Sequence, residues 1–157
     1  MPLRPLPLPA GVPGRLWLHS MPGRLEPGHQ FERMAEQAGL NRIVCLTPWD
    51  EVERLAPDYG RAIHNRPPWT WQALAMQDFG LHDDAQAFRQ GVNEIVAALH
   101  QGESVLLHCA AGIGRTGTTA ACVLKSLGLE LETALHAVRR AGSNPQSALQ
   151  SGLLDGF

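Results

Sequence analysis

Short apolar runs alternate along this chain with longer segments in which apolar residues recur every three or four positions. Residues 15–19 have the alternation of a strand, and the continuous apolar run of residues 42–46 predicts a parallel strand buried on both faces. Residues 69–76 and 105–107 predict two further strands.

The segments between these strands have helical periodicity. Phe88, Val92, Ile95 and Leu99 share one helical face, which predicts a helix that ends near His100. Further helices are predicted over residues 26–38, 49–55, 57–64, 117–127 and 132–141, with a short one from Gln146. Strands that alternate with helices predict an α/β fold, with a mostly parallel central sheet flanked by helices on both sides.

The composition is typical of one soluble globular domain. The chain has 157 residues, of which 44% are hydrophobic and 18% charged, so a single domain over residues 1–157 is predicted. The proline-rich residues 1–14 predict an extended N-terminal arm, either a loose terminus or a ligand for a proline-binding domain. Proline interrupts this start too often for a signal peptide, and no apolar run is long enough to span a bilayer.

Charge and cysteine content limit the expected partners and compartment. The net charge of -2 gives no reason to expect nucleic acid or a membrane as a partner. Three cysteines, an odd number, do not form a disulfide framework, and a cytoplasmic location is therefore predicted.

The candidate chemistry is concentrated in residues 104–119. A predicted strand leads to His108 and Cys109, glycines follow, and a predicted helix lies just beyond Arg115. A strand, a glycine-containing loop and a helix N-terminus together make an anion site, because backbone N–H groups converge there and the helix dipole adds positive potential. The spacing between Cys109 and Arg115 allows one loop to surround a single tetrahedral oxyanion.

Each side chain at the ends of this loop has an expected role. Cys109 is expected to be a thiolate at neutral pH, because the helix N-terminus and a guanidinium both stabilise the anion, and a thiolate is a nucleophile toward phosphorus. Arg115 presents a planar fork of donors to two phosphate oxygens. Thr116 is expected to hydrogen-bond the sulfur, and His108 to orient the loop from behind.

Residues 108–116, His-Cys-Ala-Ala-Gly-Ile-Gly-Arg-Thr, resemble the H-C-x-x-G-x-x-R-[ST] signature of the cysteine-based protein tyrosine phosphatases at every fixed position. Residues 77–80, Gln-Asp-Phe-Gly, look like the general-acid loop of its dual-specificity-like group, similar to the cyclin-dependent-kinase-associated phosphatase. The resemblance implies a protein phosphatase that hydrolyses phosphotyrosine, with phosphoserine and phosphothreonine as further candidates, through a phosphocysteine intermediate on Cys109. A phosphorylated protein or peptide would be its substrate, and no cofactor is implied. Besides Arg115, the implied phosphate-binding residues are Ala110, Ala111, Gly112, Ile113 and Gly114.

The leaving group needs a proton, so a carboxylic acid is expected from another loop. Asp78 is the prediction, because it follows a strand that should end at the same sheet edge as the Cys109 strand. Asp83 and Asp84 are the alternatives, with helix capping as their other role. Gln146 and Gln150 resemble the family stretch in which a glutamine positions the hydrolytic water, or they form a polar helix face.

Two other functions use a similar loop. A non-catalytic phosphoresidue-binding module would not need Cys109, Arg115, Thr116 and an acid together. A rhodanese-like sulfurtransferase also places a cysteine in an anion loop, but the arginine-threonine ending and the Asp78 loop favour phosphate chemistry. Cys45 is either a buried apolar cysteine or the partner of Cys109 in an oxidative disulfide. The histidines have no metal-ligand spacing, and no metal is predicted.

Overall fold

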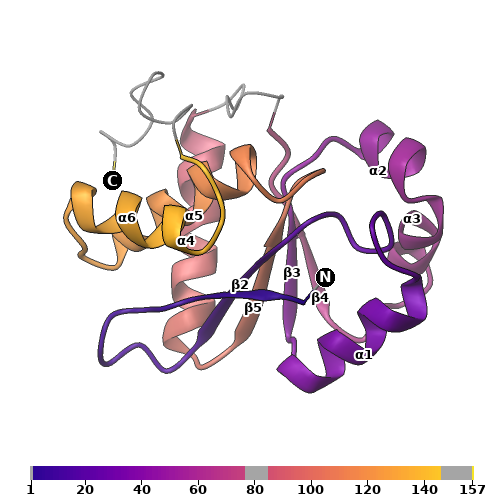
Figure 1. Ribbon diagram of the computed structural model, residues 1–157, viewed down its shortest axis with the longest axis horizontal. Coiled ribbons are helices and arrows are strands. Elements are labelled where there is room, and N and C mark those ends of the chain that lie inside the picture. Colours follow the sequence, from indigo (N-terminus) through magenta and orange to yellow (C-terminus); the bar gives the residue numbers. More distant parts are fainter. Residues whose placement is uncertain (1, 77–84, 146–156) are drawn as a thin grey trace.

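Figure 1 shows a computed structural model of the protein, which describes residues 2–76, 85–145 and 157. The predicted acid Asp78, its alternatives Asp83 and Asp84, and the helix predicted from Gln146, which includes Gln150, lie outside the described residues.

One sheet runs through the centre of the molecule. Its strands are β1 (Arg4–Leu6), β2 (Arg15–His19), β3 (Arg42–Cys45), β4 (Thr70–Ala73) and β5 (Ser104–His108). They lie in the order β1-β2-β5-β3-β4, and every neighbouring pair is parallel except β1 and β2. The predicted mostly parallel sheet is therefore confirmed, with the strand that leads to Cys109 in the middle of it.

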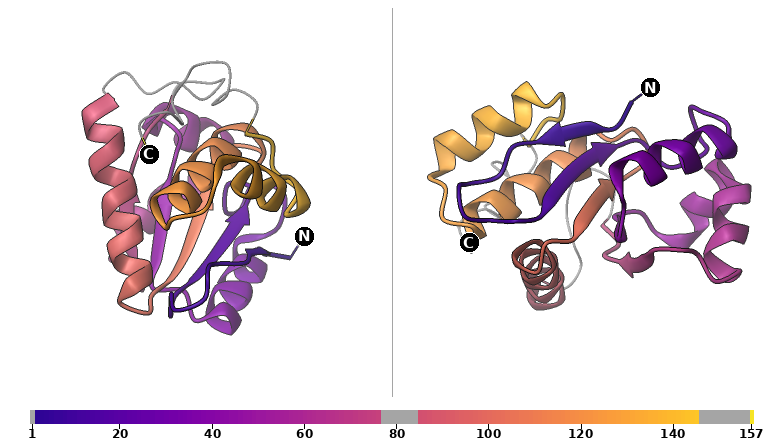
Figure 2. Two further views of the ribbon diagram at one scale, coloured as in Figure 1. Left: turned by 90° about the vertical axis from the view of Figure 1, so that its left-hand side faces the viewer. Right: turned by 90° about the horizontal axis from the view of Figure 1, so that it is seen from below.

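The helices form two layers, one on each face of the sheet (Figures 1 and 2). One layer contains α1 (Gly28–Ala38), α2 (Trp49–Leu55) and α3 (Pro57–His64), and the other contains α4 (Ala85–His100), α5 (Gly114–Ser126) and α6 (Leu131–Arg140). Alternate residues of β5 face the two layers: Leu107 packs in the cluster of α4, α5 and α6, and Leu106 packs with Phe31 of α1. All of β5 is buried, so the strand that leads to Cys109 is fixed from both sides.

The N-terminal arm is not a loose terminus, and that interpretation is wrong for residues 4–6. Arg4 pairs with Leu18 and Leu6 with Leu16 in an antiparallel ladder, and the side chain of Leu6 is buried. Pro5 is tolerated because β1 is an edge strand, where one backbone N–H is not needed. The same burial argues against these residues being an exposed ligand for a proline-binding domain.

Two predicted helix boundaries are also corrected. α5 begins at Gly114 rather than at residue 117, so Arg115 and Thr116 belong to its first turn. A first turn made of glycine, arginine and threonine has no apolar periodicity, so the sequence pattern did not reveal it. α1 begins at Gly28 rather than at residue 26, because Glu26 is instead buried against His19, to whose Nε2 its carboxylate is paired.

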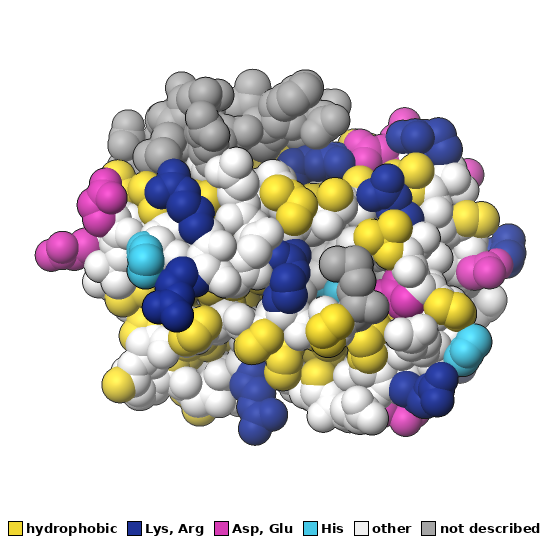
Figure 3. Space-filling model, viewed as in Figure 1, with side chains coloured by type: hydrophobic (Ala, Val, Ile, Leu, Met, Phe, Trp, Pro, Cys, Tyr) yellow, Lys and Arg dark blue, Asp and Glu magenta, His cyan; other side chains and the backbone are white. Residues whose placement is uncertain are grey.

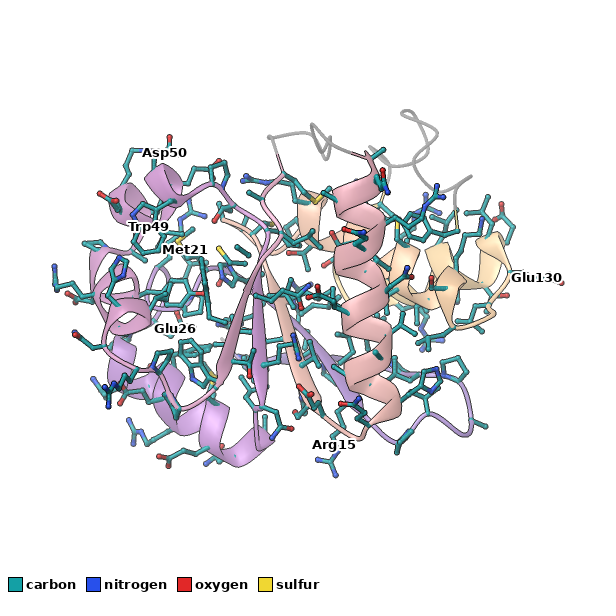
Figure 4. All side chains as sticks on the ribbon, turned by 180° about the vertical axis from the view of Figure 1, so that it is seen from behind. Arg15, Met21, Glu26, Trp49, Asp50 and Glu130 are labelled. Atoms are coloured by element: carbon teal, nitrogen blue, oxygen red, sulfur yellow. The ribbon has the colours of Figure 1, made fainter. Side chains whose placement is uncertain are left out.

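The carboxyl ends of the parallel strands lie side by side, and Cys109 directly follows β5 at this end of the sheet. Figure 4 shows the two ends of the parallel strands: Asp50, in the helix after β3, lies beyond their carboxyl ends, and Arg15, which starts β2, lies at the opposite ends. Across the described ranges, no helix has the length and apolar character needed to cross a membrane.

Candidate active site

Three carbonyl groups of the loop between β5 and α5 are turned outward, toward other segments of the chain. The bonded pairs are Ala110 O with Met21 N (3.2 Å), Gly112 O with Arg4 Nη2 (2.6 Å) and Ser143 Oγ (2.7 Å), and Ile113 O with Asn144 N (3.0 Å). No peptide bond among the described residues is cis, so the N–H that follows each carbonyl points the opposite way, into the loop. Inward N–H groups at a helix start are the donors that an oxyanion requires.

Glycine is required at two positions that shape this loop. Gly112 has φ of +78°, and a Cβ there would lie 2.5 Å from His19 O. A Cβ on Gly117 would lie 2.7 Å from the carbonyl carbon of Asn144, so α5 and the chain after α6 approach too closely for any side chain. The loop therefore packs directly against the backbone on both sides.

Cys109 lies near the N-terminal end of α5, with only 3% of its surface exposed. Its Sγ accepts hydrogen bonds from Gly112 N and from Thr116 Oγ1, each at 3.2 Å. Both donors stabilise negative charge on sulfur. Thr116 reaches the sulfur because α5 begins early enough to include it in the first turn.

Arg115 is held in place by a carboxylate from the opposite layer. Its Nη1 and Nη2 donate to the two oxygens of Glu51 in α2, at 2.9 and 3.0 Å, and Nη1 also lies 3.4 Å from Met76 O. Two parallel bonds fix the plane of the guanidinium as well as its position. Glu51 was not among the residues predicted for the site; the available signal was an acidic residue soon after a predicted strand adjoining the Cys109 strand.

His108 is connected to α3 and β4 behind the loop. Its Nδ1 lies 3.0 Å from Cys109 O, which can only accept, so Nδ1 carries the proton and Nε2 accepts from the Tyr59 hydroxyl at 2.7 Å. Trp71 Nε1 donates to the same hydroxyl at 3.1 Å. Burial is the main cause that lowers the pKa of His108 to about 4, so the ring is neutral at physiological pH. This geometry suits the orienting role expected of His108, and Tyr59 is a supporting residue that the sequence did not reveal.

The buried neutral histidine predicts acid-sensitive stability. His108 takes up a proton near pH 6.5 when unfolded but only near pH 4 when folded, so the unfolded state binds more protons between these values. We expect the free energy of unfolding to fall by about 3 kcal/mol through this group as the pH drops from 6.5 toward 4. His19, whose pKa is lowered mainly by burial, acts in the same direction.

Urea unfolding at pH 7 and pH 5 measures this dependence. His108→Gln should be less stable at pH 7 but lose less stability between the two values than the wild type. His100→Gln, at an exposed position, should keep the wild-type dependence. Equal pH dependence in all three proteins would show that His108 is not the group responsible.

The remaining cysteines are buried and free. Cys45 Sγ lies 3.3 Å from Thr47 Oγ1, and burial raises the pKa of this thiol. Burial raises the pKa of Cys122 to about 12. These are the properties of core thiols, and the oxidative disulfide between Cys45 and Cys109 stays a prediction.

The described chain leads toward two of the predicted site segments. Met76, whose carbonyl contacts Arg115, lies two positions before Asp78, and Asn144, which donates to Ile113 O, lies two positions before Gln146. No cluster of three or more histidine, cysteine, aspartate or glutamate side chains suited to a metal is found among the described residues.

Two features of the surface lie outside the loop. On the face seen in Figure 3, basic side chains are spread among acidic and apolar ones and form no continuous track. A cavity of about 460 Å³ lies between α1 and the chain before β4, with Gly39, Leu40 and Trp69 in its lining. Since these residues precede β3 and β4, the cavity lies at the amino ends of the parallel strands, opposite Cys109.

A family model described as "PTP-SAK: Swiss Army Knife protein, DSP-PTPase phosphatase domain" matches residues 11–151. Tyrosine-protein phosphatase 1 of Caenorhabditis elegans is 44% identical over 62 residues, which cover 35% of this chain and 6% of that protein. Laforin of Mus musculus is 26% identical over 118 residues, which cover 68% of this chain and 35% of that protein. The matches thus span a small part of the first relative and about a third of the second.

Solved structures share the fold at low sequence identity. Kinase associated phosphatase (KAP), with its catalytic-site cysteine replaced by serine, superposes with a TM-score of 0.78 at 18% identity and covers 98% of this chain and 97% of that one. The active form of Tk-PTP gives a TM-score of 0.67 at 22% identity and covers 98% of both chains. The sheet and its two helical layers are therefore the α/β arrangement of these phosphatases.

Proposed function

Because the chain belongs to the DSP-PTPase family of phosphatases, we propose that it is a phosphoric monoester hydrolase acting on phosphotyrosine in proteins or peptides, with phosphoserine and phosphothreonine as further candidate substrates. The observation that carries this proposal is the Cys109 sulfur, which accepts from Gly112 N and Thr116 Oγ1 at the start of α5. We further propose that residues 1–157 form one phosphatase domain, which works in the reducing cytoplasm that a catalytic thiol needs.

In the first step the Cys109 thiolate attacks phosphorus in line with the ester oxygen. The S–P bond forms as the P–O bond breaks, and Asp78 gives its proton to the departing oxygen. The N–H groups of residues 110–114 and the guanidinium of Arg115 bind the phosphoryl oxygens, so the charge on these oxygens is stabilised where it develops. Glu51 supports this step by fixing the plane of Arg115.

In the second step water attacks the phosphocysteine, and phosphate leaves. Asp78 takes the proton from the water, and Gln146 or Gln150 positions that water. The S–P electrons return to Cys109, where the Thr116 hydroxyl at 3.2 Å stabilises the thiolate. The contact between Met76 O and Arg115 supports Asp78 as the acid, because Met76 lies two residues before Asp78 and is already beside the guanidinium.

Asp78→Asn is expected to lower kcat by about 10²–10⁴-fold for a tyrosyl or alkyl phosphate, because the leaving oxygen then departs without a proton. With an activated aryl phosphate, whose leaving group needs little protonation, the loss should be much smaller. The measurement is kcat across a series of leaving groups. Asp83→Asn and Asp84→Asn are the controls and should remain near wild type. If Asp83→Asn or Asp84→Asn shows the leaving-group dependence and Asp78→Asn does not, the general acid is the residue replaced in that control variant.

Turnover separates this function from its alternatives. The purified protein should release phosphate from para-nitrophenyl phosphate and from a phosphotyrosyl peptide, and parallel assays with phosphoseryl and phosphothreonyl peptides define its specificity. The uncharged side chains of Ala110, Ala111 and Ile113 favour a protein phosphomonoester over a highly charged inositol lipid. Binding without turnover would indicate a phosphoresidue-binding module, and transfer of sulfur from thiosulfate to cyanide would indicate a sulfurtransferase.

A further inference from the structure

The Arg4 side chain, from strand β1, joins the anion loop to the residues after α6, although Arg4 lies far from both in the sequence. Its Nη2 donates to Gly112 O at 2.6 Å, and its Nη1 donates to Ala141 O at 2.8 Å and to Ser143 Oγ at 3.1 Å. Ser143 Oγ in turn donates to Gly112 O at 2.7 Å. The fork of one guanidinium thus connects the loop to the end of α6.

The bond to Gly112 O determines the direction of the next N–H. In a trans peptide the carbonyl and the following N–H point in opposite directions, so a Gly112 carbonyl held by Arg4 turns the N–H of Ile113 into the loop. Gly112 has a φ of +78° and no side chain that could restrict the orientation of this peptide group. External donors therefore set its orientation.

Arg4 also brings a positive charge whose hydrogen-bond partners are neutral. In the described part of the chain its hydrogen bonds go to two carbonyl oxygens and one hydroxyl, whereas Arg115 is paired with Glu51 and Arg42 with Glu103. Burial lowers the pKa of Arg4, and attraction to the charge of Cys109 opposes this effect. The guanidinium is thus close enough to the sulfur to add positive potential to the loop.

The position of Arg4 depends on β1. Arg4 pairs with Leu18 of β2, and Leu6 is buried two residues later, so the strand holds the side chain over the loop. A Cβ on Gly142 would lie 2.8 Å from Arg4 Nη1, and the glycine thus leaves space for the guanidinium.

We propose that Arg4 is a positioning residue of the phosphate loop, which turns the Ile113 N–H toward the bound oxyanion and adds a second positive charge behind it. The proposal rests on the proposed function and extends the machinery of that site to the N-terminal strand. It predicts that loss of Arg4 weakens anion binding even where the fold is intact.

The test compares Arg4→Met with the wild type by calorimetric titration of tungstate, a tetrahedral oxyanion that needs no turnover. We expect Arg4→Met to bind tungstate at least about tenfold more weakly, the effect of losing a charged hydrogen-bond donor. KM for para-nitrophenyl phosphate should rise by a similar factor. Ser143→Ala, which leaves β1 untouched, should weaken tungstate binding by a smaller factor in the same direction.

Arg42→Met is the control, because the Arg42 guanidinium also joins two segments, through Glu103 and Gln72, but at the opposite end of the sheet. It should lose stability and keep tungstate affinity within about twofold of wild type, since its bonds lie far from the loop. Unchanged tungstate affinity in Arg4→Met and Ser143→Ala, or an equal loss in Arg42→Met, would overturn the proposal. A wild type that binds tungstate without turning over substrate would refute the phosphatase function, while the affinities of the variants would still decide the role of Arg4.

Discussion

Cys109→Ser is expected to lower kcat for para-nitrophenyl phosphate by at least about 10⁴-fold while leaving the fold intact, because serine does not ionise at this position and the hydroxyl is a far weaker nucleophile. The two bonds to Sγ, from Gly112 N and Thr116 Oγ1, stabilise an anion that the serine oxygen does not provide. Initial rates with a contaminant-free preparation measure the loss.

Two controls separate chemistry from folding in this experiment. The Cys109→Ser protein should still bind tungstate, since the backbone N–H groups and Arg115 remain. Cys45→Ser removes another buried thiol and should keep most of the activity, because Cys45 contacts Thr47 rather than the loop. Substantial turnover by Cys109→Ser would exclude the covalent mechanism.

Arg115→Lys is expected to lower kcat/KM by about 10³-fold or more, although the charge is retained. An ammonium is a point charge without the planar fork, so it cannot bind both oxygens of Glu51 and at the same time present parallel donors to a phosphoryl group. The loss should appear in kcat as well as in KM, because the guanidinium stabilises charge that develops in the transition state. Kinetics with a phosphotyrosyl peptide measure both constants.

Arg42→Lys provides the control for this substitution. Arg42 is likewise paired with a carboxylate, that of Glu103, but at the other end of the strands. Its replacement should leave kcat/KM near the wild-type value. Near wild-type kcat/KM in Arg115→Lys would instead mean that this guanidinium does not contact the phosphate.

The sheet and most helices could be predicted because burial leaves a periodic pattern in the sequence. β5 was predicted from its apolar run, and α4 from the three- and four-residue recurrence of Phe88, Val92, Ile95 and Leu99, all of which are buried. β1 left no such pattern, because a three-residue edge strand containing Pro5 resembles any proline-rich terminus. The first turn of α5 was missed for a similar reason, since it faces the site rather than the core.

The anion loop could be predicted because all its members are contiguous. Its supports could not, because they are long-range: Arg4 lies 108 positions from Gly112, Glu51 64 from Arg115, and Tyr59 49 from His108. No local spacing encodes these contacts, which exist only once the strands are ordered as β1-β2-β5-β3-β4.

Detection of the phosphocysteine is the most direct test of the covalent mechanism. A phosphotyrosyl peptide is mixed with a stoichiometric amount of enzyme, quenched in acid within one turnover, and the digested protein is examined by mass spectrometry. The covalent mechanism predicts one phosphoryl group on the digested peptide that contains Cys109, bound through sulfur, together with an equal amount of dephosphorylated substrate peptide. Phosphate on another residue, or full turnover in which no phosphoenzyme forms, would contradict this mechanism.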